Sequence, residues 1–407
     1  MKIMMINSVC GIRSTGRICT DLAVMLEERG HEVKIAYGRE SVPEQFAKYA
    51  VRIGSNWGVN LHGAKARLLD GSGFGSTAAT KRFVRWIKEY DPDVIHLHNI
   101  HGYYLDIRVL FAYLRSCGKP ILWSFYDCWT FTGHCAHFDF NGCEKWKSAC
   151  GKCRHIDEYP RSFFDYSGRN YREKRKLFTG IPGLQIIAPS AWMASMVAQS
   201  YLREYPCHIL PNGIDTDNFY PRDNRIRDRY GIGDRYLVVG VSSVWQKMKG
   251  IEYMNRLAEQ LPKEAYRVFL VGRMPDGLEV SSEIIRMDAT NSIDELCQIY
   301  SAADVFVNPT LQETQGLTTV EAFACGTPAV VFRSGGAAEC VDESCGAAVP
   351  KGDFEALLQS VRDICESGAS FSRGCIECAA AYSKQKRYED FMKLYDMMGS
   401  CRNEVVF

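Results

Sequence analysis

Residues 308–336 read NPTLQETQGLTTVEAFACGTPAVVFRSGG, and the organisation of the whole chain can be worked out from this stretch. The run just before it, Val305–Val307, is β-branched and aromatic, which is typical of a buried strand. A threonine pair then favours a helix start and Gly-Thr-Pro favours a helix end, so the pattern predicts a helix over 319–325. Ala329–Phe332 is a second apolar run of strand type. We therefore expect a strand–loop–helix–strand unit of a parallel sheet.

Two carboxylates in this stretch, Glu313 and Glu321, form an E-x7-E arrangement. Between them, Gly316 lets a ligand approach the main chain, and the helix start near Leu317 offers N–H groups and positive dipole density to an anion. Glu321 could accept two hydrogen bonds from a vicinal diol. An anion beside a sugar diol describes a nucleotide sugar. The alternative is that Glu321 is only a favourable charge near a helix start.

The full string from Glu313 to Pro328, E-x2-G-x4-E-A-x-A-x-G-T-P, resembles the donor-site signature of glycosyltransferase family 4, a large family of retaining enzymes with the GT-B fold. One departure is Gln315, because the family often has an aromatic residue there. The resemblance spans nearly the whole chain and is strongest over 236–336. The strings STGRI, HLHNIHGYY and FTGHC are similar to enzymes of bacterial capsule, exopolysaccharide or colanic-acid assembly.

The length of 407 residues exceeds the usual size of one hydrophobic core, so two domains are expected. We predict an α/β chain of two Rossmann-like, doubly wound domains facing across a cleft, which is the GT-B fold implied by the resemblance. The expected N-terminal, acceptor-binding domain covers 1–218 and carries a cysteine-rich insertion over 128–160, called the insertion below. The expected nucleotide-sugar domain covers 219–383. A helical segment over 384–407 is expected to cross back to the first domain.

The net charge of +1 argues against nucleic acid as the main partner, because proteins that bind nucleic acid normally have a strongly basic surface. No signal peptide or membrane-spanning run is evident in the sequence, so we expect a cytoplasmic protein, at most peripheral at the inner face of the plasma membrane. The basic stretch Tyr171–Phe178 is either a solvated helix face or a contact with anionic lipid. The seventeen cysteines should be thiols or metal ligands rather than disulfides.

Further donor-site residues follow from the resemblance. Lys249, in the loop after the strand that begins at Tyr236, matches the lysine with which the family neutralises the donor diphosphate. The arginine that usually precedes it is missing, and Lys247 could substitute as a point charge without bidentate geometry. Arg273 ends the next strand, and Gly16 lies in the glycine loop of the first β-α-β unit, so both are also expected to contact the donor.

The expected acceptor side lies in the first domain. Tyr126 stands where the family commonly has a histidine that contacts the transferred sugar, and the aspartate that follows matches Asp127. A tyrosine hydroxyl can still hydrogen-bond a sugar hydroxyl, but it carries no charge near neutral pH. His98 ends a buried strand and is predicted to face the cleft. Asn212, in the turn of the family-like string PNGID, is predicted to lie at the cleft as well.

Four cysteines of the insertion, Cys135, Cys143, Cys150 and Cys153, form the pattern C-x7-C-x6-C-x2-C. The C-x2-C end is common in zinc knuckles, although the whole spacing matches no standard finger. The surrounding residues are rich in Gly, Lys and aromatics and show little apolar periodicity. The sequence therefore predicts one structural zinc, and four unrelated thiols remain the alternative.

The implied reaction moves a sugar from a UDP- or GDP-sugar to a hydroxyl of a growing, lipid-linked glycan, with retention at the anomeric carbon and without a catalytic metal. Lys249 and the N–H groups near Gly316 would stabilise the leaving diphosphate, Glu321 would hold the ribose diol and Glu313 would contact sugar hydroxyls. Two alternatives remain open. One is another GT-B enzyme that uses no acceptor, such as an epimerase or hydrolase, and the other is a non-catalytic, two-lobed sugar-binding protein.

Overall fold

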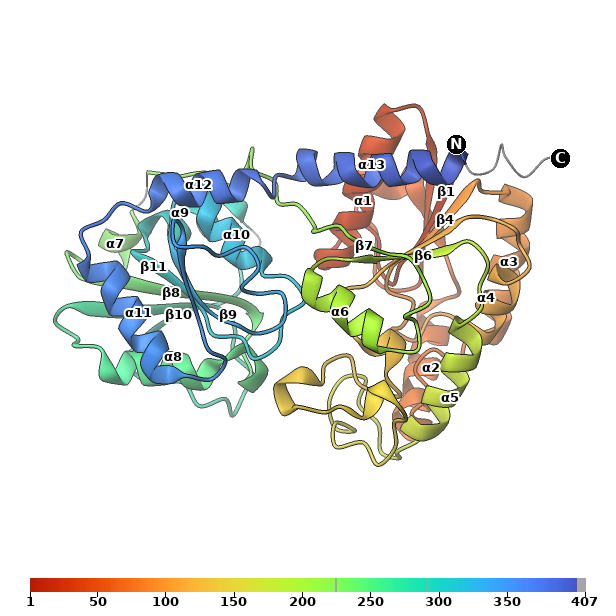
Figure 1. The fold of residues 1–407 in the computed structure, drawn as a ribbon, viewed down its shortest axis with the longest axis horizontal. Coiled ribbons are helices and arrows are strands. Elements are labelled where there is room, and N and C mark those ends of the chain that lie inside the picture. The colour runs from red at the N-terminus through yellow and green to blue at the C-terminus, as the bar shows by residue number, and fades with distance from the viewer. Residues whose placement is uncertain (224, 291, 401–407) are drawn as a thin grey trace. The chain divides into compact units, whose positions relative to one another are not determined.

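The computed structural model describes residues 1–223, 225–290 and 292–400 and shows helices around two separate sheets (Figure 1). The last seven residues of the expected C-terminal segment, 401–407, lie outside the described residues. Among the described residues, no helix is both long and apolar enough to cross a membrane.

The chain divides into two compact units. Unit 1 comprises Met1 to Leu210 together with the C-terminal segment that begins at Tyr388, whereas unit 2 comprises Pro211 to Arg387. The boundary after Leu210 lies before the expected position at residue 218, because the PNGID turn is fastened to unit 2. The last helix, α13 (Lys384–Ser400), begins in unit 2 and continues in unit 1.

Unit 1 contains a seven-stranded sheet in the order β3-β2-β1-β4-β5-β6-β7, and every neighbouring pair is parallel. The strands β1 and β4 are buried along almost their whole length, as expected for a parallel sheet covered on both faces. The strands are β1 (Lys2–Ile6), β2 (Glu32–Tyr37), β3 (Ala50–Arg52), β4 (Val94–Leu97), β5 (Ile121–Ser124), β6 (Leu184–Ala188) and β7 (Cys207–Ile209).

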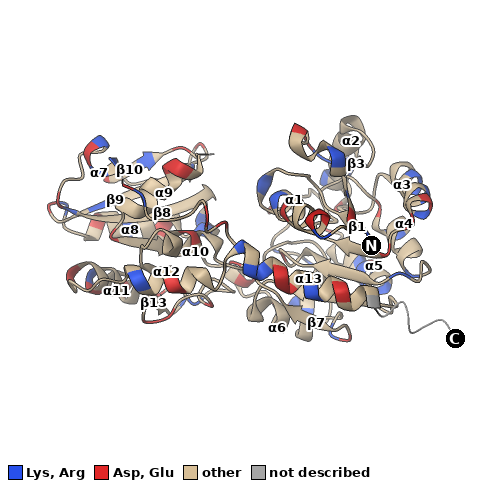
Figure 2. Ribbon diagram, turned by 90° about the horizontal axis from the view of Figure 1, so that it is seen from above, with Lys and Arg blue, Asp and Glu red and all other residues tan. Residues whose placement is uncertain are grey.

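Helices cover both faces of the unit 1 sheet. Apolar residues of α1 and α13 pack on one face, while those of α3 to α6 pack on the other. Along α13, basic and acidic residues are interspersed rather than gathered into one basic face (Figure 2). The helices are α1 (Arg13–Glu28), α2 (Asn56–Leu69), α3 (Thr77–Tyr90), α4 (Ile107–Leu114), α5 (Ser167–Phe178) and α6 (Ala191–Gln199), with short 3-10 turns η1 (Glu44–Tyr49), η2 (Trp129–Phe131), η3 (Asp139–Asn141) and η4 (Lys145–Lys147).

Unit 2 contains a six-stranded parallel sheet in the order β10-β9-β8-β11-β12-β13. Its strands are β8 (Tyr236–Val244), β9 (Tyr266–Arg273), β10 (Ile284–Met287), β11 (Val305–Asn308), β12 (Ala329–Phe332) and β13 (Gly346–Val349). Its helices are α7 (Ile226–Arg229), α8 (Ile251–Gln260), α9 (Ile293–Ala302), α10 (Leu317–Ala324), α11 (Phe354–Glu366) and α12 (Ser372–Ala380), with the 3-10 turn η5 (Lys247–Lys249). One doubly wound parallel sheet in each unit confirms the predicted fold class.

The strand–loop–helix–strand unit predicted from the opening stretch is present as β11, α10 and β12. The helix starts at Leu317, two residues before the predicted start at 319. The reason is that the carbonyl of Gly316 already accepts the N–H groups of Thr319 and Val320 at 3.1 and 3.2 Å. No side-chain hydroxyl caps this helix, which leaves its N-terminal end to the main chain.

Candidate functional site

The strand order of unit 2 reverses direction between β8 and β11, which are neighbours although β9 and β10 separate them in sequence. In doubly wound sheets, ligands bind in the crevice at the carboxyl ends of two such neighbouring strands, where the connections that follow the strands run in opposite directions. The loops leaving these two ends carry Lys249 and Glu313, and the structure joins the two side chains in an ion pair. Each is about one-quarter exposed (24%), so the pair remains open to a ligand.

A close approach of the two loops fixes this pair. The carbonyl of Met248 accepts the N–H of Leu311 at 2.8 Å. Gly250 follows with φ of +78°, and a Cβ atom there would lie 2.1 Å from the carbonyl oxygen of Pro309. Only glycine fits this position, both for its backbone conformation and for the space available.

The far end of the opening stretch returns to Glu313. Gly336 donates its N–H to the carbonyl of Glu313 at 2.8 Å. Gly335 has φ of +60°, and a Cβ atom there would lie 1.9 Å from the same carbonyl oxygen. The main chain of Glu313 is therefore held by the Gly335-Gly336 turn, while its carboxylate faces Lys249.

Glu321 lies in α10 and is half-buried. The hydroxyl of Tyr300 donates a hydrogen bond to its Oε2 atom at 3.1 Å. Burial, together with the nearby carboxylate, raises the pKa of Tyr300 well above its usual value, so the hydroxyl keeps its proton. The helix begins at Leu317, next to Gly316, so the positive end of its dipole points toward this part of the loop.

The departure at Gln315 has a structural explanation. Its side-chain oxygen accepts both the main-chain N–H and the side-chain amide of Asn212, at 2.9 and 2.8 Å. Its own amide donates to the carbonyl of Asn212 at 2.9 Å. Asn212, which was predicted to lie at the cleft, thus ties the start of unit 2 to the loop of Glu313. Nothing in the sequence pattern indicated this partnership.

The remaining predicted donor residues lie in different settings. Lys247 is 73% exposed and pairs with Glu252 at 3.5 Å. Arg273 is exposed at the carboxyl end of β9, on the same edge of the sheet as Lys249. Gly16 lies in the first turns of α1 in unit 1, where a Cβ atom would meet Val9 at 3.0 Å. Within unit 2 the structure thus gathers the predicted donor residues at one edge, with the Lys249–Glu313 pair at its centre.

In unit 1, His98 follows β4 and Tyr126 follows β5, again at the carboxyl ends of neighbouring strands. The Nδ1 atom of His98 and the hydroxyl of Tyr126 share a hydrogen bond of 2.9 Å, and the two rings are nearly parallel. Burial lowers the pKa of His98 to about 3 and raises that of Tyr126, so both are neutral. The Nε2 atom of His98 is buried and has no partner among the described residues. A neutral imidazole nitrogen in this position is suited to a sugar hydroxyl.

Asp127 is engaged through both carboxylate oxygens. One oxygen lies 2.7 Å from Nε2 of His101, and the other accepts the N–H of Trp129 at 2.9 Å. Burial opposes the charged carboxylate, but the charge and hydrogen bond of His101 outweigh it and lower the pKa of Asp127. The hydroxyl of Tyr159 shares a 3.1 Å hydrogen bond with the other nitrogen of His101. Asp127 therefore links β5 to the insertion.

The four predicted metal ligands of the insertion are free thiols that line one cavity of about 20 Å³. A second thiol cluster, which the sequence reasoning missed, lies in unit 2. Within the described part of the chain, its members Asp342, Cys345 and Cys378 are the one group of metal-ligand type whose donor atoms all lie within 4.8 Å of one another. The spacings of its cysteines, C-x4-C from Cys340 and C-x2-C from Cys375, were the available signal.

Comparison with known proteins gives the class to which this architecture belongs. The sequence profile described as Glycosyltransferase Family 4 matches residues 15–218, and the profile described as Glycosyl transferases group 1 matches residues 235–367. The chain therefore belongs to glycosyltransferase family 4.

Individual relatives agree with this assignment. The chain is 25% identical to the putative colanic acid biosynthesis glycosyl transferase WcaC of Escherichia coli, over 97% of this chain and 99% of the relative. Sucrose-phosphate synthase from Thermosynechococcus elongatus has a similar structure, with a TM-score of 0.71 at 16% identity over 98% of this chain and 99% of the other. Anabaena HepE in complex with UDP-glucose matches with a TM-score of 0.67 at 16% identity, over 98% and 100%. The fold is thus GT-B, and the chain is a glycosyltransferase.

Proposed function

We propose that this glycosyltransferase moves a sugar from a UDP- or GDP-sugar to a hydroxyl of a lipid-linked glycan, with retention of anomeric configuration, during assembly of a surface polysaccharide. The observation that carries the proposal is the Lys249–Glu313 pair at the strand reversal of unit 2, with Glu321 following in α10. The similarity to a colanic acid enzyme and to a UDP-glucose complex supports the acceptor class and the donor class respectively.

Unit 2 binds the donor in this proposal. Glu321 accepts hydrogen bonds from the two ribose hydroxyls, and its bond from Tyr300 fixes the direction of the carboxylate. The diphosphate lies against Lys249 and the start of α10, where an ammonium group and a helix dipole both favour negative charge. Lys249 then exchanges its ion pair with Glu313 for contact with the phosphate, which frees Glu313 to accept hydroxyl groups of the sugar.

The transfer step breaks the bond between the anomeric carbon and the diphosphate oxygen, and the electron pair leaves with the diphosphate. Positive charge develops on the sugar ring while negative charge grows on the leaving group. Lys249 stabilises that growing charge, so its contribution is largest in the transition state. The acceptor oxygen attacks from the face that the diphosphate leaves, and its proton passes to a diphosphate oxygen. This route retains the configuration and needs neither a separate base nor a metal ion.

Unit 1 contributes neutral hydrogen-bonding groups. The buried Nε2 atom of His98 supplies one donor or acceptor for a hydroxyl of the sugar or of the acceptor. Tyr126 holds the His98 ring in place and so takes the part of a positioning residue. Asp127 acts in the same way through His101. In this proposal Tyr126 acts through His98 rather than by its own hydrogen bond to the sugar.

The acceptor class is supported by a cavity of about 660 Å³ between α2 and α3 of unit 1. Its lining includes the cations Arg52, Lys65 and Arg82 and the apolar side chains of Trp57 and Leu61. Cations beside apolar surface suit a molecule with a phosphate group and a hydrocarbon chain. We therefore assign this cavity to the lipid phosphate of the acceptor.

An apolar surface continues outward from this cavity. Trp57 and Leu61 are 74% and 56% exposed on α2, and Phe163 and Phe164 are 64% and 57% exposed. Phe163 adjoins the same helix, because its N–H donates to the carbonyl of Arg67 at 2.7 Å. Exposed aromatics with neighbouring cations suit the interface of an anionic membrane. In the proposal this surface, rather than the Tyr171–Phe178 stretch, holds the enzyme against the lipid that carries its acceptor.

The α5 stretch is less suited to that role. Its Tyr171, Lys174 and Phe178 are buried, and the ammonium group of Lys174 donates to the carbonyls of Trp129 and Thr132 at 2.7 and 3.2 Å. One of the cations of this helix, Lys174, therefore lies inside unit 1 and is not available to a lipid surface.

The activity test combines the purified chain with a panel of UDP- and GDP-sugars and measures nucleotide release with and without a membrane lipid extract. Release that depends on the extract, with an α- or β-linkage matching that of the donor, supports the proposal. Release without any acceptor, or conversion of the sugar while it stays on the nucleotide, would instead favour a hydrolase or an epimerase. Nucleotide binding with no turnover on any donor would favour a binding protein.

The membrane contact is tested by sedimentation with vesicles of phosphatidylcholine alone or with phosphatidylglycerol added. The double variant Trp57→Ala/Phe163→Ala should lose most of its binding to the anionic vesicles, while Ile376→Ala, which removes a 42% exposed apolar residue of unit 2, should retain it. Equal sedimentation of the wild type and both variants would show that this surface does not bind the membrane.

A further inference from the structure

The insertion brings its four cysteines around a single small space. Cys135, Cys143, Cys150 and Cys153 all line the cavity of about 20 Å³, which has room for roughly one water-sized sphere. Cys135 and Cys153 are close enough for a thiol–thiol hydrogen bond. Four free thiols from a segment of nineteen residues, Cys135 to Cys153, thus line one small cavity, with their sulfur atoms not all within 4.8 Å of one another.

Main-chain N–H groups already point at two of the sulfurs. Gly133 donates its N–H to Sγ of Cys150 at 3.2 Å, and the N–H of His155 is directed at Sγ of Cys153. Hydrogen-bond donors directed at sulfur suit an atom that carries negative charge as a metal ligand. The two cysteines that they serve are those of the C-x2-C end.

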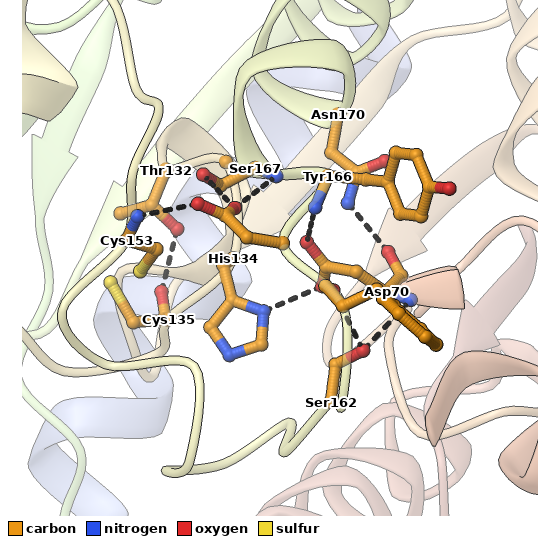
Figure 3. Close-up of polar contacts among 12 residues, drawn as sticks. Asp70, Thr132, His134, Cys135, Cys153, Ser162, Tyr166, Ser167 and Asn170 are labelled. Carbon is orange, nitrogen blue, oxygen red and sulfur yellow. Dashed lines mark hydrogen bonds and ion pairs between the residues drawn. The ribbon is translucent and has the colours of Figure 1, made fainter. Parts of the chain in front are cut away.

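Buried polar contacts hold the backbone beside this cavity against the rest of unit 1 (Figure 3). His134, adjacent to Cys135, forms a fully buried ion pair of 2.5 Å with Asp70 at the end of α2. Asp70 also accepts the N–H of Tyr166 at 3.2 Å. The hydroxyl of Thr132 donates to the carbonyl of Cys135 at 2.6 Å. These contacts hold the backbone next to Cys135 against the rest of unit 1.

We propose that Cys135, Cys143, Cys150 and Cys153 bind one zinc ion as a tetrahedral tetrathiolate. Each thiol releases its proton to solvent as its sulfur bonds the metal, and four protein ligands leave no position open for a reacting water. The site is structural and does not depend on the donor or acceptor of the enzyme. It orders the insertion, which begins directly after Asp127 and carries the Trp129 N–H that this carboxylate binds.

The second thiol cluster is the competing location. Its donor atoms are closer together, but Oδ1 of Asp342 is already occupied by the N–H and hydroxyl of Ser344, at 2.8 and 2.6 Å. Cys345 and Cys378 also lie against the main core of unit 2, where a thiol is stable as a small apolar side chain. Zinc bound there would be a different site, so the experiment separates the two.

The experiment is metal analysis of the full-length protein purified without chelator. We expect close to one zinc per chain in the wild type and at least a fivefold loss in the double variant Cys150→Ser/Cys153→Ser. The matched control Cys345→Ser/Cys378→Ser should keep its zinc. Absence of zinc from the wild type, zinc that is lost from the control instead, or iron in place of zinc would overturn the proposal.

A measurement on the wild type covers the case in which the serine variant fails to fold. X-ray absorption at the zinc edge should show four sulfur neighbours at about 2.3 Å, and no nitrogen or oxygen. An oxygen atom among the zinc ligands would contradict the proposal, because all four ligands of the proposed site are cysteine sulfurs. Mass spectrometry without reduction should find all four cysteines unpaired after the zinc is removed, and a native disulfide among them would equally contradict it.

Discussion

The Glu313 loop of unit 2 and the insertion of unit 1 both carry predicted site residues outside regular helices and strands, yet they are held in place differently. The Glu313 loop is held by close backbone approaches at Gly250 and Gly335, with the Gln315–Asn212 hydrogen bonds as a side-chain addition. The insertion is fixed by side chains, through the buried His134–Asp70 pair and through packed aromatic residues such as Phe138 and Trp146. Backbone rules are readable from sequence, whereas long-range side-chain partners are not.

The largest expected effect tests what the rigid loop is for. Lys249→Ala should reduce kcat by about 10²–10³, or about 2.7–4 kcal/mol, because it removes a preorganised charge from the leaving group. Donor affinity should fall much less. Steady-state kinetics with the preferred nucleotide sugar measure both quantities. The control is Lys263→Ala, which breaks a comparable ion pair with Glu283 at the surface of the same unit, and its kcat should be unchanged. A Lys249→Ala enzyme with normal kcat and weakened binding would make Lys249 a binding residue only.

Two glycines with nearly the same positive φ allow the Glu313 loop and the insertion to be compared directly. Gly335 has φ of +60° and Gly142 of the insertion has φ of +62°, but a Cβ atom on Gly142 would meet nothing within 4 Å. Gly142→Ala should therefore cost only the left-handed conformation, about 1–2 kcal/mol.

Gly335→Ala should cost more, because its Cβ atom would overlap the carbonyl of Glu313, and it should also weaken donor binding by moving that residue. Urea unfolding and nucleotide titration of both variants measure the difference. Equal unfolding free energies with unchanged nucleotide binding in both would show that the Gly335 contact does not position the loop.

A smaller effect concerns pH. The pKa of His98 is about 3 in the folded protein, because of burial, and about 6.5 when unfolded. Between these values the unfolded chain binds the extra proton, so the contribution of His98 to stability should fall as the pH drops below about 6.5 and stay level above it. The maximum slope for one histidine is about 1.4 kcal/mol per pH unit.

The buried His96, whose pKa is also lowered by burial, adds to the same slope. Urea unfolding between about pH 4.5 and 8 measures it, and this range lies above the window in which Asp127 takes up its proton. His98→Gln should reduce the slope. An unchanged slope in that variant would mean that His98 is not the buried neutral group described here.

Local pattern predicted the regular elements well. The strand Ala329–Phe332 was predicted with its observed ends, because an apolar run between turn residues defines it. A local rule also explains the start of α6, where the Ser190 hydroxyl accepts the N–H of Met193 at 3.1 Å. The start of α10 was misplaced because a main-chain carbonyl, not a threonine hydroxyl, takes the first N–H groups.

The site was predictable as far as it follows local motifs. The E-x7-E string located Glu313 and Glu321, and the resemblance located Lys249. The pairing of Gln315 with Asn212 spans more than one hundred residues of sequence. The burial of Lys174 likewise depends on a carbonyl far from its own helix. Such contacts are decided by the packed fold, so a reading of α5 as an amphipathic basic helix could not anticipate that its central lysine is buried.

The most direct test of donor binding at the strand reversal of unit 2 is calorimetric titration of UDP and GDP into the wild type, Glu321→Gln and Glu366→Gln. Glu321 and Glu366 each accept a hydrogen bond from a buried or half-buried tyrosine of unit 2, from Tyr300 at 3.1 Å and Tyr266 at 2.6 Å. Each charge-assisted hydrogen bond contributes about 1.5–3 kcal/mol, so Glu321→Gln should weaken binding of the preferred nucleotide at least tenfold while Glu366→Gln binds as the wild type does. Wild-type affinity in Glu321→Gln, with the fold intact by circular dichroism, would contradict the donor site.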